Sequence, residues 1–361
     1  MGAGLYPVQR VLMNKPTKSV ITAVAIGSAV AATAVVGSAA ALVGARAAIR
    51  ALCSQPVPEG AVVLITGGSR GLGYAMASRF AHKHVRLVLA ARDRGELERA
   101  QASLIAEHPH LAPEDFYLFS GDLMDPGECR RLIAETVAHF GRIDVLVNNA
   151  GIIEVGPVEN QSVESFERAL RIYYLAPVTI TLAALPHLLR QSPGPGWKRR
   201  AAIVNISSIG GKVAVPHLLP YCAGKFALTG FSEGLHAELR HKGIRVTTVC
   251  PGLMRTGGED HAGFAGQVEK EQRWFKLSAK TPGVSASVRC AASRIYSAVV
   301  TGRAELTITP QAWVAARLHG LCPETSQYAA SLANRYILPA PHGSDGRADE
   351  ISSPSGVLSP S

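Results

Sequence analysis

The chain has 361 residues and a formal net charge of +10, with 47% hydrophobic and 18% charged residues. This length suits one large domain with appendages. Lys and Arg are spread along the chain, and their densest cluster, residues 198–200, follows a loop-like sequence, so no nucleic-acid partner is indicated. The six cysteines lie far apart, without C-x-x-C or a histidine pair at zinc spacing. We therefore predict no metal site, no disulfide framework and reduced thiols in a cytosolic setting.

Residues 19–45 contain no charged side chain and are long enough to cross a bilayer, which needs about 20 apolar residues. Basic residues flank this segment on both sides and leave its orientation open: Arg10, Lys15, Lys18, Arg46 and Arg50. We predict an N-terminal segment, residues 1–55, that carries a single-pass membrane anchor, with the folded domain in the cytoplasm. The alternative is an Ala-rich helix docked on the protein or on a partner subunit of a cytoplasmic protein.

Strand-like and helical patterns alternate after a linker at 54–60. The strand-like runs are 61–67, 85–92, 115–123, 143–151, 201–208 and 244–252, and the helical runs are 71–83, 93–108, 128–141, 165–191 and 220–243. Strands that are apolar on both faces and joined by helices belong in a parallel sheet covered on both sides. The prediction for residues 60–310 is a doubly wound α/β domain, a Rossmann fold, to which 305–310 adds an edge strand.

Two further helical patterns follow this domain and form a predicted C-terminal helical extension, residues 311–339. The extension has three open roles: a roof over a pocket, a contact in a homodimer or homotetramer, or a contact with the bilayer. The last segment, 340–361, is rich in Ser, Gly and Pro, and we predict that it is disordered.

A glycine-rich turn, TGGSRGLG at 66–73, joins the first strand to the first helix. Such glycines allow a tight turn and bring backbone N–H groups close to a pyrophosphate at the positive end of the helix. The predicted cofactor-binding residues here are Gly67, Ser69, Arg70, Gly71, Leu72 and Gly73. The alternative is that the glycines serve only the geometry of the strand-to-helix junction.

Tyr221 and Lys225 lie four residues apart in the helical pattern 220–243, so the phenol and the ammonium group share one helix face. In isolation the pair could be a surface pair whose polar ends reach solvent.

The chain resembles a classical short-chain dehydrogenase/reductase of the membrane-anchored type. The family pattern TG-x-x-x-G-x-G is met at 66–73, NNAG at 148–151, NISS at 205–208, Y-x-x-x-K at 221–225 and PG at 251–252. The resemblance implies Ser208, Tyr221 and Lys225 as catalytic residues. It further implies that the cofactor is bound by Asp122, Leu123, Asn149, Ala150, Gly151, Tyr221, Lys225, Pro251, Gly252 and Thr256.

The implied reaction is hydride transfer between nicotinamide and a ketone or secondary alcohol. Tyr221 would exchange the proton with the substrate oxygen, which Ser208 would hold by a hydrogen bond. Lys225 would lower the pKa of Tyr221 through its charge and hydrogen-bond the nicotinamide ribose.

The end of the second strand favours NADP over NAD. Enzymes that use NAD commonly have a carboxylate there, and this chain has Ala91 followed by Arg92. Arg92 and Arg70 suit a 2′-phosphate. The alternative is that Arg92 pairs with Glu96 on the next helix and Arg70 lies in solvent. Asp93 keeps NAD open as the less favoured cofactor.

The chain departs from the family at Tyr173, where the family has an asparagine that holds a water next to the lysine. This departure keeps open a cofactor-binding scaffold or redox sensor with weak or no turnover, and a third class, an anchoring protein. The predicted substrate is a small lipophilic molecule, by analogy with membrane-bound relatives. Trp274 and Phe275 would either line its pocket or pin the loop to the core.

Overall fold

The computed structural model describes residues 54–192, 201–255, 262–280 and 285–341. The chain divides into two units, Met1–Cys53 and Ser54–Ser361, and every described residue belongs to the second. The predicted anchor at 19–45 and most of the tail predicted to be disordered therefore lie outside the described residues.

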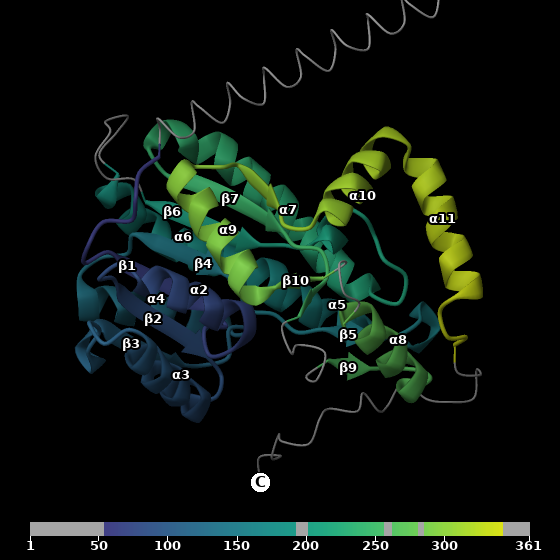
Figure 1. The fold of residues 1–361 in the computed structure, drawn as a ribbon, viewed down its shortest axis with the longest axis horizontal. Helices are drawn as coiled ribbons and strands as arrows, with labels where there is room; N and C mark the ends of the chain where they lie inside the picture. Colours follow the sequence, from purple (N-terminus) through teal and green to yellow (C-terminus); the bar gives the residue numbers. More distant parts are fainter. Residues whose placement is uncertain (1–53, 193–200, 256–261, 281–284, 342–361) are drawn as a thin grey trace, which may run out of the picture. The chain divides into compact units, whose positions relative to one another are not determined.

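A sheet of seven parallel strands forms the centre of the second unit, in the order β11-β7-β6-β4-β1-β2-β3 (Figure 1). The strands are β1 (Val62–Thr66), β2 (Arg86–Ala91), β3 (Phe116–Ser120), β4 (Val145–Asn148), β6 (Ala202–Ile206), β7 (Arg245–Cys250) and β11 (Glu305–Thr307). The predicted doubly wound parallel sheet is confirmed, and the predicted edge strand is β11.

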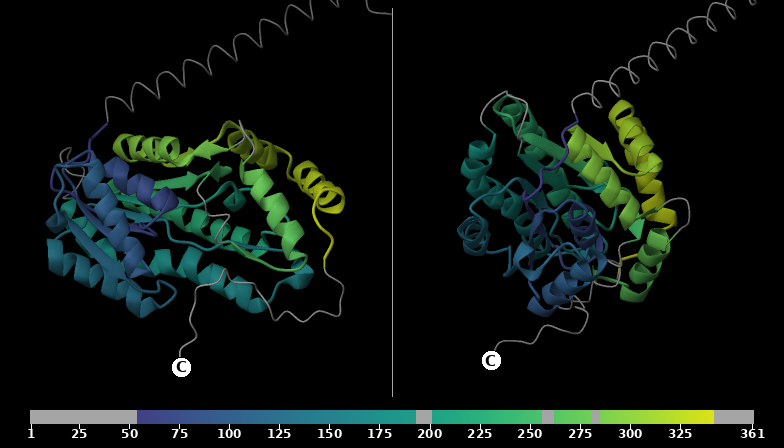
Figure 2. Two further views of the ribbon diagram at one scale, coloured as in Figure 1. Left: turned by 60° about the horizontal axis from the view of Figure 1, so that its bottom comes forward. Right: turned by 60° about the vertical axis from the view of Figure 1, so that its left-hand side comes forward.

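Helices cover both faces of this sheet (Figure 2). One face carries α2 (Gly71–Ala81), α3 (Arg94–Glu107) and α9 (Val288–Thr301), and the other carries α4 (Pro126–Phe140), α6 (Ala176–Gln191) and α7 (Leu219–Leu239). Within β1, Val63 and Ile65 face the first layer while Val62 and Leu64 face the second. Both sets are fully buried, which is why the strands have no polar face.

The helix predicted at 165–191 is not uniform. Helix α5 (Val163–Leu170) passes into a π-helical turn, Arg171–Leu175, and then into α6. Within the described residues, the stretch Val163–Gln191 is the one helix long and apolar enough to cross a membrane by length and composition. Its apolar side packs into the core against the sheet, so it is weak evidence for a span.

Smaller elements lie beyond the carboxyl ends of the strands. Two parallel pairs, β5 (Glu154–Val155) with β9 (Gly263–Phe264) and β8 (Met254–Arg255) with β10 (Ala286–Ser287), accompany α8 (Val268–Lys280). A small core of Val155, Ala262 and Phe264 packs against Trp274 and Phe275. Of the two roles left open for these aromatic residues, the structure therefore favours pinning the loop. Helices α10 (Pro310–Leu321) and α11 (Pro323–Tyr336) follow the last strand.

A row of polar side chains is buried across the middle of the sheet. Asn148, Asn205 and Thr248 occupy paired positions on β4, β6 and β7. The Asn148 amide donates to Asn205 Oδ1 at 2.8 Å, the Asn205 amide donates to Ser232 Oγ at 3.0 Å, and Thr248 donates to the same Oγ at 2.7 Å. Buried polar groups need such partners, so this row specifies how the three strands align.

Candidate active site

The glycine-rich turn follows β1. From β1 the chain adds β2 and β3 on one side and then β4 on the other side, so the turn lies where the order of the strands reverses. Gly67 and Gly71 have φ values of 65° and 56°, which side chains disfavour. A Cβ at Gly73 would lie 1.9 Å from the Gly67 carbonyl oxygen, so no side chain fits there. Helix α2 begins without a side-chain cap and without an acidic residue in its first turn. This backbone cradle with its positive helix end fits the pyrophosphate of a dinucleotide.

The NNAG turn at the end of β4 is tied to the same cradle. Asn149 donates its side-chain amide to the Thr66 carbonyl at 2.9 Å and to the Gly67 carbonyl at 3.2 Å. The backbone N–H groups of Asn149 and Ala150 donate to Thr66 Oγ1 at 2.9 and 3.0 Å. The structure thus brings together two predicted cofactor-binding segments that are about 80 residues apart in sequence.

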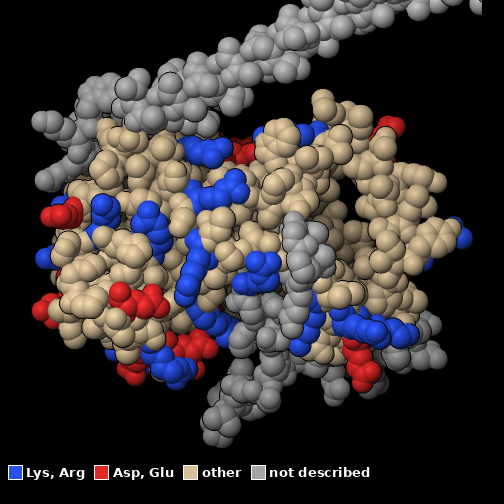
Figure 3. Space-filling model, viewed as in Figure 1, with Lys and Arg blue, Asp and Glu red and all other residues tan. Residues whose placement is uncertain are grey.

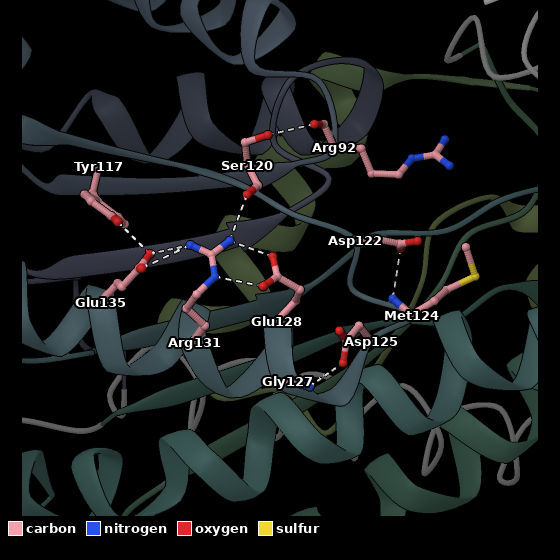
Figure 4. Close-up of polar contacts among 10 residues, drawn as sticks. All are labelled: Arg92, Tyr117, Ser120, Asp122, Met124, Asp125, Gly127, Glu128, Arg131 and Glu135. Carbon is pink, nitrogen blue, oxygen red and sulfur yellow. Dashed lines mark hydrogen bonds and ion pairs between the residues drawn. The ribbon is translucent and has the colours of Figure 1, made fainter. Parts of the chain in front are cut away.

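Two arginines near the ends of β2 and β3, Arg92 and Arg131, differ in their contacts (Figure 4). Arg131 is held by Glu128, by Glu135 and by the Ser120 carbonyl, so its charge is compensated. Arg92 is exposed, its side chain points away from this cluster, and within the described residues it forms no ion pair.

The alternative pairing of Arg92 with Glu96 is not present. Glu96 instead pairs with Arg70 at 3.3 Å and accepts a hydrogen bond from Ser69 at 2.9 Å. Asp93, which kept NAD open, caps α3 by accepting the Glu96 N–H at 2.8 Å. Among the described residues, these contacts leave Arg92 as an exposed arginine at this strand end that forms no ion pair.

The remaining predicted cofactor residues are distributed along the same edge of the sheet. Asp122 follows β3 and accepts the N–H of Met124, and Leu123 is buried. Pro251 and Gly252 follow β7, and a Cβ at Gly252 would lie 2.2 Å from Thr309 Oγ1. Thr256 lies outside the described residues.

The predicted catalytic residues come from β6 and α7. Ser208 lies just after β6, where its Oγ accepts the Gly210 N–H at 3.0 Å, and a Cβ at Gly210 would lie 3.0 Å from Tyr221 Cε1. Lys225 is 5% exposed and donates from Nζ to the Ile206 carbonyl at 2.7 Å. Its Nζ lies 5.7 Å from the centroid of the Tyr221 ring. Serine, phenol and ammonium groups therefore share one buried site.

The prediction that the charge of Lys225 lowers the pKa of Tyr221 does not hold in this structure, because both side chains are buried. Burial raises the pKa of Tyr221 to about 12, although the Ser208 hydroxyl opposes the rise. Burial also lowers the pKa of Lys225 to about 7. Because an ammonium group that is partly neutral at pH 7 stabilises a phenolate weakly, desolvation outweighs the charge effect in the cofactor-free protein. Tyr221 therefore keeps its proton at neutral pH.

Tyr173, on the π-helical turn, completes the site. Lys225 Nζ lies 4.1 Å from the centroid of its ring, and the Tyr173 and Tyr221 rings meet edge to face at 5.3 Å. A Cβ at Gly151 would lie 2.5 Å from Tyr173 Cε1, and one at Gly224 would lie 2.9 Å from Tyr173 Cβ. The NNAG turn and α7 thus both have glycine where the Tyr173 side chain packs.

A second buried polar cluster was missed by the sequence analysis. His217 Nδ1 lies 2.8 Å from Glu271 Oε1, and Trp274 Nε1 donates to the same carboxylate. His217 has a φ of 64°, unusual for a residue other than glycine. The cluster joins the segment before Tyr221 to α8. Nothing in the sequence indicated it, because Glu271 stands in a highly charged run that is typical of an exposed helix.

A cavity of about 890 Å³ lies between α11, the segment 213–219 and the outer side of α7. Figure 3 shows it as a hollow beside the two C-terminal helices. The body of the domain supplies largely apolar walls, including Val213, Pro216, Leu219 and Phe226. Neither Ser208 nor Tyr221 lines it, and the lining residues Leu219 and Phe226 lie on a different face of α7 from Tyr221. The polar groups of the site are therefore not part of this cavity.

Comparison with known proteins agrees with this geometry. A family model described as short chain dehydrogenase matches residues 61–263. The chain belongs to the short-chain dehydrogenase/reductase family. The curated relatives that it matches are named dehydrogenases or reductases. In the described residues we find no cluster of side chains suited to a metal, and the five cysteines there are free thiols.

Several members of the short-chain dehydrogenase/reductase family are similar in sequence. "Dehydrogenase/reductase SDR family member 7" of Homo sapiens is 35% identical over 58% of this chain and 59% of its own length, less than two thirds of that protein. An Anopheles gambiae protein, "Dehydrogenase/reductase SDR family protein 7-like", is 33% identical over 70% of this chain and 76% of its own. "11-beta-hydroxysteroid dehydrogenase-like 4A" of Arabidopsis thaliana is 31% identical over 74% and 82%.

Solved structures of short-chain dehydrogenases are similar in fold. A short-chain dehydrogenase from Streptomyces avermitilis has a TM-score of 0.63 and 27% identity, over 77% of this chain and 98% of that one. A family member from Burkholderia phymatum in complex with NAD has a TM-score of 0.66 over 74% and 95%. At 22% identity the second likeness concerns the fold alone.

Proposed function

We propose that this chain is an NADP-dependent reductase of lipophilic ketones. The observation that carries the proposal is the convergence of Ser208, Tyr221 and Lys225 beside a glycine cradle suited to a dinucleotide. Bound nicotinamide supplies the hydride. Ser208 orients the substrate oxygen, Tyr221 donates the proton, and Lys225 orients the ribose. Because burial raises the pKa of Tyr221 to about 12, the residue holds the proton that reduction requires.

The preference for a lipophilic substrate is supported by the cavity beside α7 and by the two C-terminal helices. Large apolar side chains on these helices are exposed, among them Trp313, Leu318, Leu321, Tyr328 and Tyr336. A surface of this kind suits a site that receives apolar molecules from a membrane. Together with the uncharged segment 19–45, it supports a membrane-anchored enzyme. The likeness to a protein named for hydroxysteroid dehydrogenases suggests substrates of steroid size.

Purified full-length protein is expected to oxidise NADPH with steroid, retinoid or long-chain ketones, and more slowly with small polar ketones. Loss of NADPH absorbance measures this directly. Turnover confined to small polar ketones would contradict the lipophilic assignment. Cofactor binding without turnover of any ketone would favour the alternative, a cofactor-binding scaffold or redox sensor.

The cavity provides a sharper version of this test through two neighbouring alanines of α11. Ala330 lines the cavity, whereas Ala329 is exposed and does not line it. Ala330→Trp should raise KM for a large ketone by about tenfold, the loss of roughly one well-packed apolar group. Ala329→Trp should leave KM unchanged. Equal KM values for the two variants would exclude the cavity as part of the substrate site.

Replacement of Arg92 by Asp is expected to reverse the cofactor preference. A charged hydrogen bond to phosphate contributes about 1.5–3 kcal/mol, so the affinity for NADPH should fall by about 10- to 100-fold while that for NADH is kept. Fluorescence titration with both cofactors measures the ratio. Arg99→Asp, at an exposed position further along α3, controls for the change of net charge. An unchanged ratio in Arg92→Asp would remove Arg92 from phosphate binding.

A further inference from the structure

The ammonium group of Lys225 has an unusual set of neighbours. Its Nζ donates to the Ile206 carbonyl at 2.7 Å and lies 4.1 Å from the centre of the Tyr173 ring. The Tyr221 ring is further away, at 5.7 Å. Within the described residues, Lys225 forms no ion pair with a carboxylate, and the other titratable group near it is the Cys250 thiol on β7. The closest aromatic face is therefore that of Tyr173.

Several elements fix the Tyr173 ring in that place. The side chain is 3% exposed, and the ring is presented by the π-helical turn Arg171–Leu175, an irregularity often found at functional sites. Gly151 and Gly224 allow the backbone to approach it closely, and a Cβ at Gly151 would lie 3.1 Å from the hydroxyl oxygen. The hydroxyl group thus lies against the NNAG turn, while the face of the ring is turned toward Lys225.

We propose that Tyr173 is a positioning residue for Lys225. The face of the Tyr173 ring, rather than its hydroxyl, holds the ammonium group within reach of both Tyr221 and a bound nicotinamide ribose. A cation over an aromatic face in a desolvated site is stabilised more strongly than one in solvent. The ring also occupies the space beside the lysine. The proposal rests on the proposed function for the role of Lys225.

Three variants separate the ring from the hydroxyl. Tyr173→Phe keeps the ring and removes the hydroxyl, whereas Tyr173→Leu removes the aromatic face. Tyr174→Leu is the matched control, because Tyr174 lies on the same turn but meets Phe231 at 6.2 Å instead of Lys225. If Tyr173→Leu does not fold, as judged by circular dichroism, Tyr173→Met offers an unbranched side chain that adapts to irregular space.

The first measurement is NADPH binding in the absence of substrate, by fluorescence titration. A desolvated cation–π contact of about 2 kcal/mol predicts that Tyr173→Leu weakens binding by about 10- to 30-fold. Tyr173→Phe and Tyr174→Leu should stay within about twofold of the wild type. Because no turnover is needed, this result does not depend on finding the substrate.

The second measurement is the pH at which NADPH affinity is lost. The aromatic face favours the charged form of Lys225, so its removal lowers the pKa of Lys225, and the ammonium group is lost at a lower pH. The midpoint should fall by about one pH unit in Tyr173→Leu and stay in place in Tyr173→Phe. If Tyr173→Phe and Tyr173→Leu lost NADPH affinity equally, the hydroxyl group and not the ring would position Lys225. If Tyr173→Leu kept the NADPH affinity and the pH midpoint of the wild type, the Tyr173 ring would only fill space and would not position Lys225.

Discussion

Tyr221→Phe is expected to lower kcat for ketone reduction by about 10² to 10⁴-fold, the usual contribution of a general acid. The phenyl ring can keep the edge-to-face contact with Tyr173, so the site should retain its shape and NADPH affinity should change by less than about threefold. Single-turnover loss of NADPH absorbance measures the chemical step, and fluorescence titration measures binding. The comparison separates proton donation from assembly of the site.

Tyr74→Phe is the matched control for this variant. Burial raises the pKa of Tyr74 to about 12 as well, helped by a 2.8 Å hydrogen bond to Glu107, but Tyr74 lies on α2 away from Ser208. A raised pKa alone gives no catalytic role, so Tyr74→Phe should keep kcat. If Tyr221→Phe kept more than about a tenth of the wild-type rate, Tyr221 would not be the proton donor.

Lys225→Met is expected to stabilise the cofactor-free protein at pH 6 and to weaken NADPH binding. Burial lowers the pKa of Lys225 from 10.5 in a model peptide to about 7, so between these values the unfolded chain binds more protons than the folded one. The free energy of unfolding of the wild type therefore rises with pH above 7. One pKa unit corresponds to about 1.4 kcal/mol, so the rise from pH 7 to 9 should be about 2–3 kcal/mol.

The readout is the difference in free energy of unfolding between variant and wild type, from urea titrations at pH 6 and pH 9. Methionine carries no charge, so its advantage at pH 6 should shrink by about 2–3 kcal/mol at pH 9. The loss of the hydrogen bond to the Ile206 carbonyl lowers the variant's stability at both pH values and cancels from this change. If the free energy of unfolding depended on pH in the same way in variant and wild type, the buried ammonium group of Lys225 would not destabilise the folded protein.

Lys212→Met gives the opposite behaviour in the same experiment. Although burial opposes the charge of Lys212, hydrogen bonds with Glu233 and Glu305 raise its pKa. Its stabilising contribution is complete below the unfolded pKa of 10.5, which includes the whole interval from pH 6 to 9. Lys212→Met should therefore destabilise the protein by a constant amount across this interval.

The sheet and its carboxyl-end edge could be predicted because their signals are local. Each strand is a short run that is apolar on both faces. Three of the four glycines in the turn at 66–73 meet a backbone requirement, namely Gly67, Gly71 and Gly73. The spacing of Tyr221 and Lys225 likewise follows from helix periodicity alone. These features need no knowledge of residues distant in sequence.

Features that depend on distant residues were not predictable. The pKa of Tyr221 was expected to fall, but it rises, because burial is a property of the folded environment and the sequence shows only the neighbouring lysine. The His217–Glu271 contact joins residues 54 apart. The continuous helical pattern at 165–191 gave no sign of the π-helical turn that presents Tyr173. Trp274 and Phe275 had two equal interpretations until their contacts were known.

The buried row formed by Asn148, Asn205 and Thr248 has a consequence for the precision of the site. If β6 slipped by one residue, the Asn205 amide would turn into the layer formed by α2 and α9, where the side chains are apolar. Such a slip would leave several amide and hydroxyl groups without hydrogen-bond partners in an apolar environment. The three strands must therefore end at the same level of the sheet. These buried groups contact no reactant. By fixing the register of the strands, they set the positions of the NNAG turn, Ser208 and Pro251.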